Sequence, residues 1–409
     1  MRPGIRRLAL GLGSVALLTA ASACASNSST TASGSTAGTG TSALSGSCGK
    51  IPTVAYTDQS GLVSSLGSNA ANYNGFDGTI YKSPWSSWAG KSSGVKVGVL
   101  IDGLTNPYQT ALEGLLTSGL KNDGYTPVAL APAATVTAQL QGYQTLLNDK
   151  VNLIIVQSQS PTAYNSLIDK AAKEGIPTVG VLNDVNDANA VNVVPNSVLS
   201  GMKLAQYVVQ QAGGKGLVMF LHGIAGAPID TDTATGALDV LKECPSITVN
   251  DSIQTEFQAS IAKQQVLSYL NTHTQTVSGV VTAGPFTSGV IQAFQQAGKT
   301  VPVITNNGLD EGGLAYWLQH KSSYKGVALA NTADGLAYAT VEVAQKMLNG
   351  DGVKINTIAI APPVVTSSDL STYVDLSGSS SWTLDTAGTA SGPAASFVSS
   401  DFINALFTK

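Results

Sequence analysis

Asn106, Tyr108 and Gln109 are residues whose types and spacing suit the binding of a small ligand. Carboxamides donate and accept hydrogen bonds, and an aromatic ring offers a flat apolar face. All three residues follow an apolar run that has the character of a buried strand. Open α/β sheets bind ligands beyond the carboxyl ends of their strands. The segment therefore predicts one wall of a pocket.

The elements that would position these side chains are predicted on both sides of them. The run VKVGVLI at 95–101 is typical of a parallel strand that is covered on both faces. Pro107 suits the first position of a helix, where its missing N–H costs nothing. Apolar residues then recur at helical spacing, namely Ala111, Leu112, Leu115 and Leu116. The chain is thus expected to pass from a strand to a helix through a polar loop.

The composition argues against several classes of protein. The 409 residues give room for two domains with flanking segments. Charged residues make up only 11%, the net charge is −4 and no basic block occurs, which argues against binding to nucleic acid or to an anionic membrane surface. No Gly-x-Ser-x-Gly elbow follows a predicted strand, no His-Glu-x-x-His or P-loop motif is present, and the three histidines are scattered. We therefore expect no enzyme, no metal site and no cofactor.

The N-terminus has the features of an export signal. Arg2, Arg6 and Arg7 precede an apolar run at 8–20 that is too short for an ordinary membrane-spanning helix. The run ends in Ala21-Ser22-Ala23-Cys24, which resembles the box that is cleaved before the lipidated cysteine of bacterial lipoproteins. We predict a signal peptide at 1–23, lipidation of Cys24 and a flexible Ser/Thr/Gly-rich tether over 24–49. An ordinary secretory signal cleaved nearby is the alternative.

Two further cysteines, Cys48 and Cys244, are candidates for one disulfide, since an exported protein enters an oxidising compartment. The bond would join the start of the folded body to a helix near Lys242. Between the tether and the first strand, 50–93 holds several aromatic residues without a clear period. We expect this extension to pack across the body.

Strand and helix patterns alternate beyond residue 95, as in parallel doubly wound sheets. A first series of strands is predicted at 95–101, 126–130, 153–156, 178–182 and 191–194. A second series is predicted near 216–221, 247–253, 277–281, 301–305 and 324–330. A last long helix is predicted over 333–349, with Gly350 as its C-cap. Two successive α/β series of similar size predict two lobes.

A sequence of landmarks over 95–376 resembles the type I periplasmic solute-binding proteins of the ribose-binding group. After Asn-Pro-Tyr at 106–108 come LIIVQSQSPTA, EGIPTVGVLND, VPNSVLSG, LHGIAG and FQQAGKTVPVITNNG, in the order of that family. The resemblance implies two doubly wound parallel-sheet lobes joined by a three-strand hinge. It implies an N-terminal lobe of 94–195 plus 332–358, a C-terminal lobe of 196–331 plus 359–376, and a tail of 377–409.

The resemblance also implies a pocket between the lobes. Asn106 matches the ligand asparagine of the family and Tyr108 its stacking aromatic residue, while Gln109 stands where many relatives have a second aromatic. Asn183-Asp184 replaces an Asp-Arg pair, and Ile229 to Thr233 occupies the region of a ligand arginine. The complete set of expected contacts is Asn106, Tyr108, Gln109, Gln157, Asn183, Asp184, Asp230, Thr231, Thr233, Phe286, Asn307 and Asn331, in which Phe286 would replace a lost stacking surface.

Amides and hydroxyls thus stand where relatives use arginines, and this exchange favours a neutral, hydroxyl-bearing or amide-bearing solute. Asp184, Asp230 and Asp232 leave a cationic ligand open, although Asp230 or Asp232 could instead cap the helix that follows. Together with the predicted lipoprotein signal and tether, the resemblance indicates an exported, lipid-anchored, monomeric receptor on the outer face of the cytoplasmic membrane. It would pass a sugar or polyol to an ABC permease. A lipoprotein that reports to a sensor kinase is the alternative.

Overall fold

The computed structural model describes residues 44, 46–91, 93–103 and 106–409, all within one unit, Ser42–Lys409. The predicted signal peptide and Cys24 lie outside the described residues. So does the predicted tether, apart from residues 44 and 46–49. None of the described helices is both long and apolar enough to span a membrane.

The first of two large sheets is entirely parallel, with strand order β13-β7-β6-β5-β3-β4. Its strands are β3 (Lys96–Leu100), β4 (Thr126–Ala129), β5 (Leu153–Val156), β6 (Thr178–Val181), β7 (Ala190–Pro195) and β13 (Thr357–Ile360). Its helices are α1 (Pro107–Asn122), α2 (Val136–Asn148), α3 (Asn165–Lys173) and α9 (Ala333–Leu348). Alternate residues of β3 point to opposite faces, so Val97 and Val99 pack with α1 and α9 while Leu100 packs with α2 and α3.

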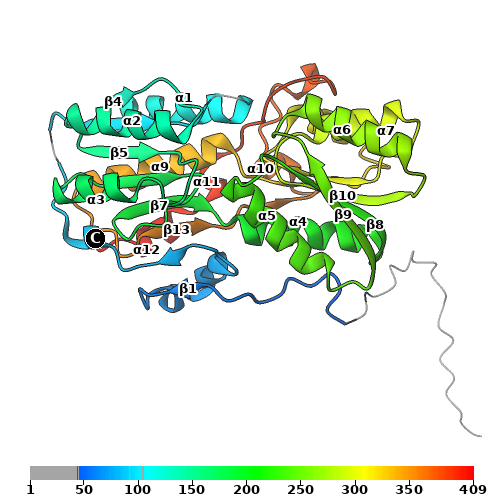
Figure 1. Cartoon of the computed structure of the whole chain (residues 1–409), viewed down its shortest axis with the longest axis horizontal. Helices are drawn as coiled ribbons and strands as arrows, with labels where there is room; N and C mark the ends of the chain where they lie inside the picture. The colour runs from blue at the N-terminus through cyan, green and yellow to red at the C-terminus, as the bar shows by residue number, and fades with distance from the viewer. Residues whose placement is uncertain (1–43, 45, 92, 104–105) are drawn as a thin grey trace, which may run out of the picture. The chain divides into compact units, whose positions relative to one another are not determined.

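The second sheet has the strand order β14-β12-β11-β10-β8-β9, and only the edge strand β14 is antiparallel. Its strands are β8 (Lys215–His222), β9 (Ser246–Gln254), β10 (Val277–Thr282), β11 (Val303–Asn307), β12 (Val327–Leu329) and β14 (Val364–Val365). The surrounding helices are α4 (Ser197–Ala212), α5 (Pro228–Leu241), α6 (Ala259–Thr272), α7 (Thr287–Gln296) and α8 (Glu311–Gln319). Figure 1 shows α1, α2, α3 and α9 around the first sheet and α4 to α7 around the second. The predicted fold class is confirmed.

The chain crosses between the sheets after β7, between β12 and α9, and after β13. β13 pairs with β7 from Thr357 to Ile360, and the Ile360 carbonyl accepts a hydrogen bond from Asn196 N at 2.6 Å. The expected lobe boundary between 358 and 359 therefore falls inside a strand of the first sheet. It is corrected to a position after Ile360, because the hydrogen-bond ladder continues to that residue.

Residues 46–91, called the strap below, contact both lobes. Tyr73 is fully buried in the first core, and its hydroxyl donates to Thr357 O at 2.9 Å. At the crossing after β7, Asn196 Nδ2 donates to the carbonyls of Asn72 and Asn74 at 2.9 and 3.0 Å. The strap contains β1 (Thr57–Asp58), η1 (Val63–Tyr73), β2 (Thr79–Ile80) and η2 (Pro84–Ser87). The strap therefore packs beside β13 and the crossing after β7, where the chain passes between the lobes.

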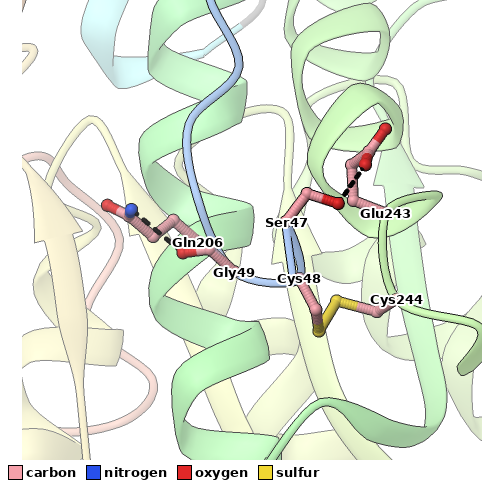
Figure 2. The surroundings of a disulfide bond; sticks show 6 residues. All are labelled: Ser47, Cys48, Gly49, Gln206, Glu243 and Cys244. Atoms are coloured by element: carbon pink, nitrogen blue, oxygen red, sulfur yellow. Dashed lines mark hydrogen bonds between the residues drawn. A yellow bond between two sulfur atoms is a disulfide. The ribbon is translucent and has the colours of Figure 1, made fainter. Parts of the chain in front are cut away.

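A disulfide ties the strap to the second lobe (Figure 2). It joins Cys48 to Cys244, which follows α5 and lies 196 residues along the chain. Beside it, Ser47 Oγ donates to Glu243 at 2.5 Å, and Gln206 Nε2 of α4 donates to Gly49 O at 3.1 Å. Both sulfurs are buried against the second core.

The C-terminal tail is also packed on the body. It contains η3 (Ser379–Ser381), α11 (Ala394–Phe397) and α12 (Ser400–Ala405), which follow α10 (Leu370–Tyr373). Phe402, Ile403 and Phe407 are buried in the first core. Farther upstream, Ala390 N donates to Leu309 O at 2.9 Å in the second lobe. The final apolar residues therefore form a docked helix, which periodicity alone could not decide.

Candidate functional site

A cavity of about 90 Å³ lies where the carboxyl ends of strands from both sheets meet. From the first sheet it is lined by Asp102, Asn106, Tyr108, Gln109, Gln157, Leu182 and Asn183. From the second sheet it is lined by Ile224, Ala227, Ile229, Phe257, Gly284, Pro285, Asn307 and Gly308, and from the crossing before α9 by Asn331. Seven of the residues expected from the sequence come together here: Asn106, Tyr108, Gln109, Gln157, Asn183, Asn307 and Asn331.

Five of these seven residues bring a buried polar atom that has no hydrogen-bond partner in the structure. The atoms are Tyr108 Oη, Gln157 Oε1, Asn183 Oδ1, Asn307 Oδ1 and Asn331 Oδ1. Only two other buried side-chain atoms in the described part of the chain share this condition, on Asn165 and Glu342. A buried polar atom left unpaired costs about 1–3 kcal/mol. Their concentration around one cavity marks it as a site that a polar solute would complete.

Neighbouring backbone carbonyls fix the orientation of two of the amides. Asn183 Nδ2 donates to Ser158 O at 2.7 Å, and Asn307 Nδ2 donates to Ala283 O at 3.0 Å. A carbonyl oxygen can only accept, so the NH₂ group must be on that side and Oδ1 on the other. Asn183 and Asn307 therefore present hydrogen-bond acceptors to the cavity.

The loop after β3 is organised by its own side chains. Asn106 is the N-cap of α1, with Oδ1 accepting from Gln109 N at 3.1 Å, and Pro107 takes the first helical position as predicted. Burial raises the pKa of the Tyr108 hydroxyl, and so does the charge of Asp334, so this group remains a neutral hydroxyl.

Asp102 is a lining residue that we did not expect from the sequence. Its carboxylate accepts from Gly103 N at 2.5 Å, from Gln109 Nε2 at 3.3 Å and from Gln159 Nε2. Burial raises the pKa of Asp102, and these hydrogen bonds act in the opposite direction. Its position directly after the apolar run at 95–101 was the available signal.

Phe257, and not Phe286, supplies the second aromatic ring of the cavity. Phe286 is fully buried in the second core, where it packs with the α6–α7 side of the sheet, so the expectation that it offers a stacking surface is corrected. Phe257 follows β9 and has a φ of 55°, in the left-handed region that is strained for an aromatic residue. A Cβ added to Gly223 would lie 2.0 Å from the Phe257 ring, and one added to Gly284 would lie 2.6 Å from it. Two glycines thus make the space that this ring occupies.

Three expected residues of α5 make their contacts away from the cavity. Asp230 is almost fully buried and accepts from Gly223 N at 2.7 Å and from His222 Nδ1 at 2.9 Å. The hydrogen bond to Asp230 is the main cause that raises the pKa of His222. The hydroxyls of Thr231 and Thr233 donate to backbone carbonyls of their own helix, at 3.0 Å to Pro228 O and 2.6 Å to Ile229 O. None of the three lines the cavity.

Asp184 and Asp232 lie near Asp77 of the strap, outside the cavity lining. Burial, followed by the charges of Asp77 and Asp184, raises the pKa of Asp232 to about 7. Asp230 is paired with His222, and none of Asp184, Asp230 and Asp232 lines the cavity. The three carboxylates therefore do not form one binding surface for a cationic ligand. Among the described residues, no group of three or more His, Cys, Asp or Glu side chains is placed to hold a metal ion.

Comparison with known proteins agrees with this architecture. Residues 97–352 match the model of the periplasmic binding protein domain family. The xylitol-binding protein of Mycolicibacterium smegmatis is 25% identical over 232 residues. The match covers 56% of this chain and 65% of that protein, just under two thirds of its length. The ribose import binding protein of Salmonella typhimurium is 22% identical over 260 residues, covering 63% of this chain and 86% of that protein.

A solved ABC transporter solute-binding protein from Thermobispora bispora has a similar fold. Its TM-score is 0.64 at 20% identity, over 76% of this chain and 94% of that structure. The family match extends over more than half of the chain and contains the strands and helices that line the cavity. The chain therefore belongs to the periplasmic binding protein domain family.

Proposed function

We propose that this protein is the solute receptor of an ABC importer and that it captures an uncharged sugar or polyol between its lobes by hinge closure. The observation that carries the proposal is the set of five unpartnered polar atoms around one cavity, contributed by both lobes and the hinge. The hydroxyl groups of such a solute would give these atoms the partners that they lack. A bound solute would thereby favour the conformation in which the lobes meet.

The charge of the lining supports an uncharged solute. No lysine, arginine or histidine is among the described residues that line the cavity, so an anionic solute would find no counter-charge there. The one carboxylate, Asp102, already accepts three hydrogen bonds from the protein. The rings of Tyr108 and Phe257 could cover the C–H face of a sugar.

We further infer that the protein binds its solute without transforming it. The described residues of the lining are amides, two aromatic rings, small or aliphatic residues and one carboxylate, and this set offers no paired nucleophile and base. Two of the similar proteins are named for binding xylitol and importing ribose, which supports a binding role. An ABC permease is the proposed partner, and the receptor would act as a monomer.

Export and lipid anchoring are part of the same proposal. The basic start, the apolar run at 8–20 and Cys24 support a lipoprotein signal, and the Ser/Thr-rich tether would hold the receptor near the outer face of the membrane. Mass spectrometry of the mature N-terminus tests this part. A diacylated Cys24 at the first position is expected, and an unmodified N-terminus would refute it.

Solute identification tests the proposed function directly. Mass spectrometry of the solute released from the purified, denatured protein should reveal a sugar or polyol. Calorimetric titration with a broad panel of neutral monosaccharides and polyols should then give binding heat for at least one compound. Absence of binding across the panel would refute the sugar or polyol assignment.

A further inference from the structure

We propose that Asn183 and Asn307 determine specificity by accepting hydrogen bonds, so that the cavity selects an uncharged ligand whose hydroxyls donate and rejects its carboxylate or phosphate counterpart. This inference rests on the proposed function and narrows it. It concerns the direction of the hydrogen bonds, which the presence of asparagine in the sequence leaves open because an amide both donates and accepts.

The first step of the argument is that each of these two amides already donates one hydrogen bond to a backbone carbonyl, which fixes its orientation. Asn183 Nδ2 is bonded to Ser158 O at 2.7 Å and Asn307 Nδ2 to Ala283 O at 3.0 Å. Rotating either amide by 180° would set its oxygen against a carbonyl oxygen, which is repulsive. The two Oδ1 atoms are therefore held as acceptors before any ligand arrives.

The second step is that these acceptors are buried and belong to different lobes. Asn183 follows β6 of the first sheet and is 7% exposed, whereas Asn307 ends β11 of the second sheet and is 3% exposed. Both Oδ1 atoms lack a partner. A ligand must therefore donate to both lobes at once, and a ligand that donates to one lobe leaves a buried acceptor unpaired on the other.

The third step concerns charge. A carboxylate or phosphate group would bring its own acceptors against Asn183 Oδ1 and Asn307 Oδ1, and the described lining residues include no cationic side chain. An ammonium group would donate, but the amide oxygens carry only partial charge and Asp102 is already hydrogen-bonded three times. Removing an ammonium ion from water for such partners is costly. Uncharged hydroxyls fit both requirements.

The experiment compares neutral probes with their anionic counterparts by calorimetry on the full chain. The pairs are xylitol with D-xylonate, D-ribose with D-ribonate, and myo-inositol with myo-inositol 1-phosphate. We expect at least one neutral probe to bind and its anionic counterpart to bind at least tenfold more weakly. If a neutral probe binds and its counterpart binds within threefold of it, this inference is overturned while the proposed function stands. If only an anionic probe binds, or none of the six does, both are overturned.

Variants test the two residues by name. Asn183→Leu and Asn307→Leu remove an acceptor at similar side-chain volume, and each should weaken binding of the neutral probe by about tenfold or more. Asn165→Leu is the matched control, since Asn165 also has a buried unpaired Oδ1 and donates to a backbone carbonyl, Asn186 O at 3.1 Å, but lies outside the cavity. It should leave affinity within twofold.

Thermal unfolding of all three variants separates folding from binding. A decrease in melting temperature that all three variants share reflects the lost hydrogen bond from Nδ2 to a backbone carbonyl. Affinity is compared only at temperatures where each variant is folded. Equal affinity of the wild type, Asn183→Leu and Asn307→Leu would overturn the inference. So would an equal loss of affinity in Asn165→Leu.

Discussion

Removal of the Cys48–Cys244 disulfide should lower the stability of this protein without changing its solute affinity. The bond links residues 196 positions apart and fixes the strap to the second lobe. Without it, Leu44, Ile51 and Val54 would be held against the second core by non-covalent packing alone. The strap would still keep its buried side chains in the first core.

The magnitude follows from the length of the closed loop. The chain-entropy estimate for a loop of this length is about 5 kcal/mol at 25 °C. With an unfolding entropy of roughly 2.1 cal/mol/K per residue over roughly 360 ordered residues, this loss lowers the melting temperature by about 7 °C. These figures are upper values, because a compact denatured state is already partly constrained.

Urea and thermal unfolding of Cys48→Ala/Cys244→Ala provide the assay, with reduced wild-type protein as a second route to the same state. Ser47→Ala is the matched control, since it removes the neighbouring exposed hydrogen bond to Glu243 and should cost less than about 1 kcal/mol. Neither cysteine lines the cavity, so affinity below the transition should stay within threefold. A double variant as stable as the oxidised wild type would refute the reasoning. A large loss in Ser47→Ala would show that packing around the bond, and not loop closure, is the cause.

Two further predictions concern the aromatic rings and pH. Phe257→Ala should weaken solute binding by about tenfold in calorimetry, with little loss of stability. Phe286→Ala should lower the free energy of unfolding in urea by about 3–5 kcal/mol and leave the affinity of the folded protein unchanged. The opposite pattern would show that Phe286, and not Phe257, contacts the solute. The pKa of Asp232 is raised to about 7 in the folded protein, so the folded state binds a proton at this carboxylate more tightly than the unfolded state does. The contribution of this protonation to the free energy of unfolding is complete below about pH 4 and is lost as the pH rises through about 7. Asp232→Asn should therefore reduce the fall in unfolding free energy between pH 5 and 8 by about 1–2 kcal/mol, and an unchanged pH profile in urea unfolding would contradict it. A residual slope is expected from Asp310, whose pKa burial also raises to about 7.

Much of the fold was predictable because it depends on local patterns. The apolar run at 95–101, Pro107 and the helical spacing after it specify a strand, a loop and a helix from neighbouring residues alone, and the structure has β3 and α1 there. The alternation of such units predicted two parallel sheets. The ends of the strands also located Asn106, Tyr108, Gln109 and Gln157, since the carboxyl edge of a parallel sheet collects such residues. The resemblance to the ribose-binding group added Asn183, Asn307 and Asn331, which line the same cavity.

Other features depended on contacts between distant segments, which no local pattern contains. Phe257 and Phe286 both follow strands of the second sheet, but only the packing of Gly223 and Gly284 decides which ring faces the cavity. In the same way, the partner of Asp230 proved to be His222 and not a solute.

The sequence by itself determined the class of fold, the loop that bears Asn106 and Tyr108, and a pocket rich in amides. Only the tertiary structure decided which way Asn183 and Asn307 present their oxygens, because each NH₂ group donates to a carbonyl that lies 25 or 24 residues away in the chain. A carboxamide has a donating NH₂ group and an accepting oxygen, and the fold decides that the oxygen is the group left for the solute.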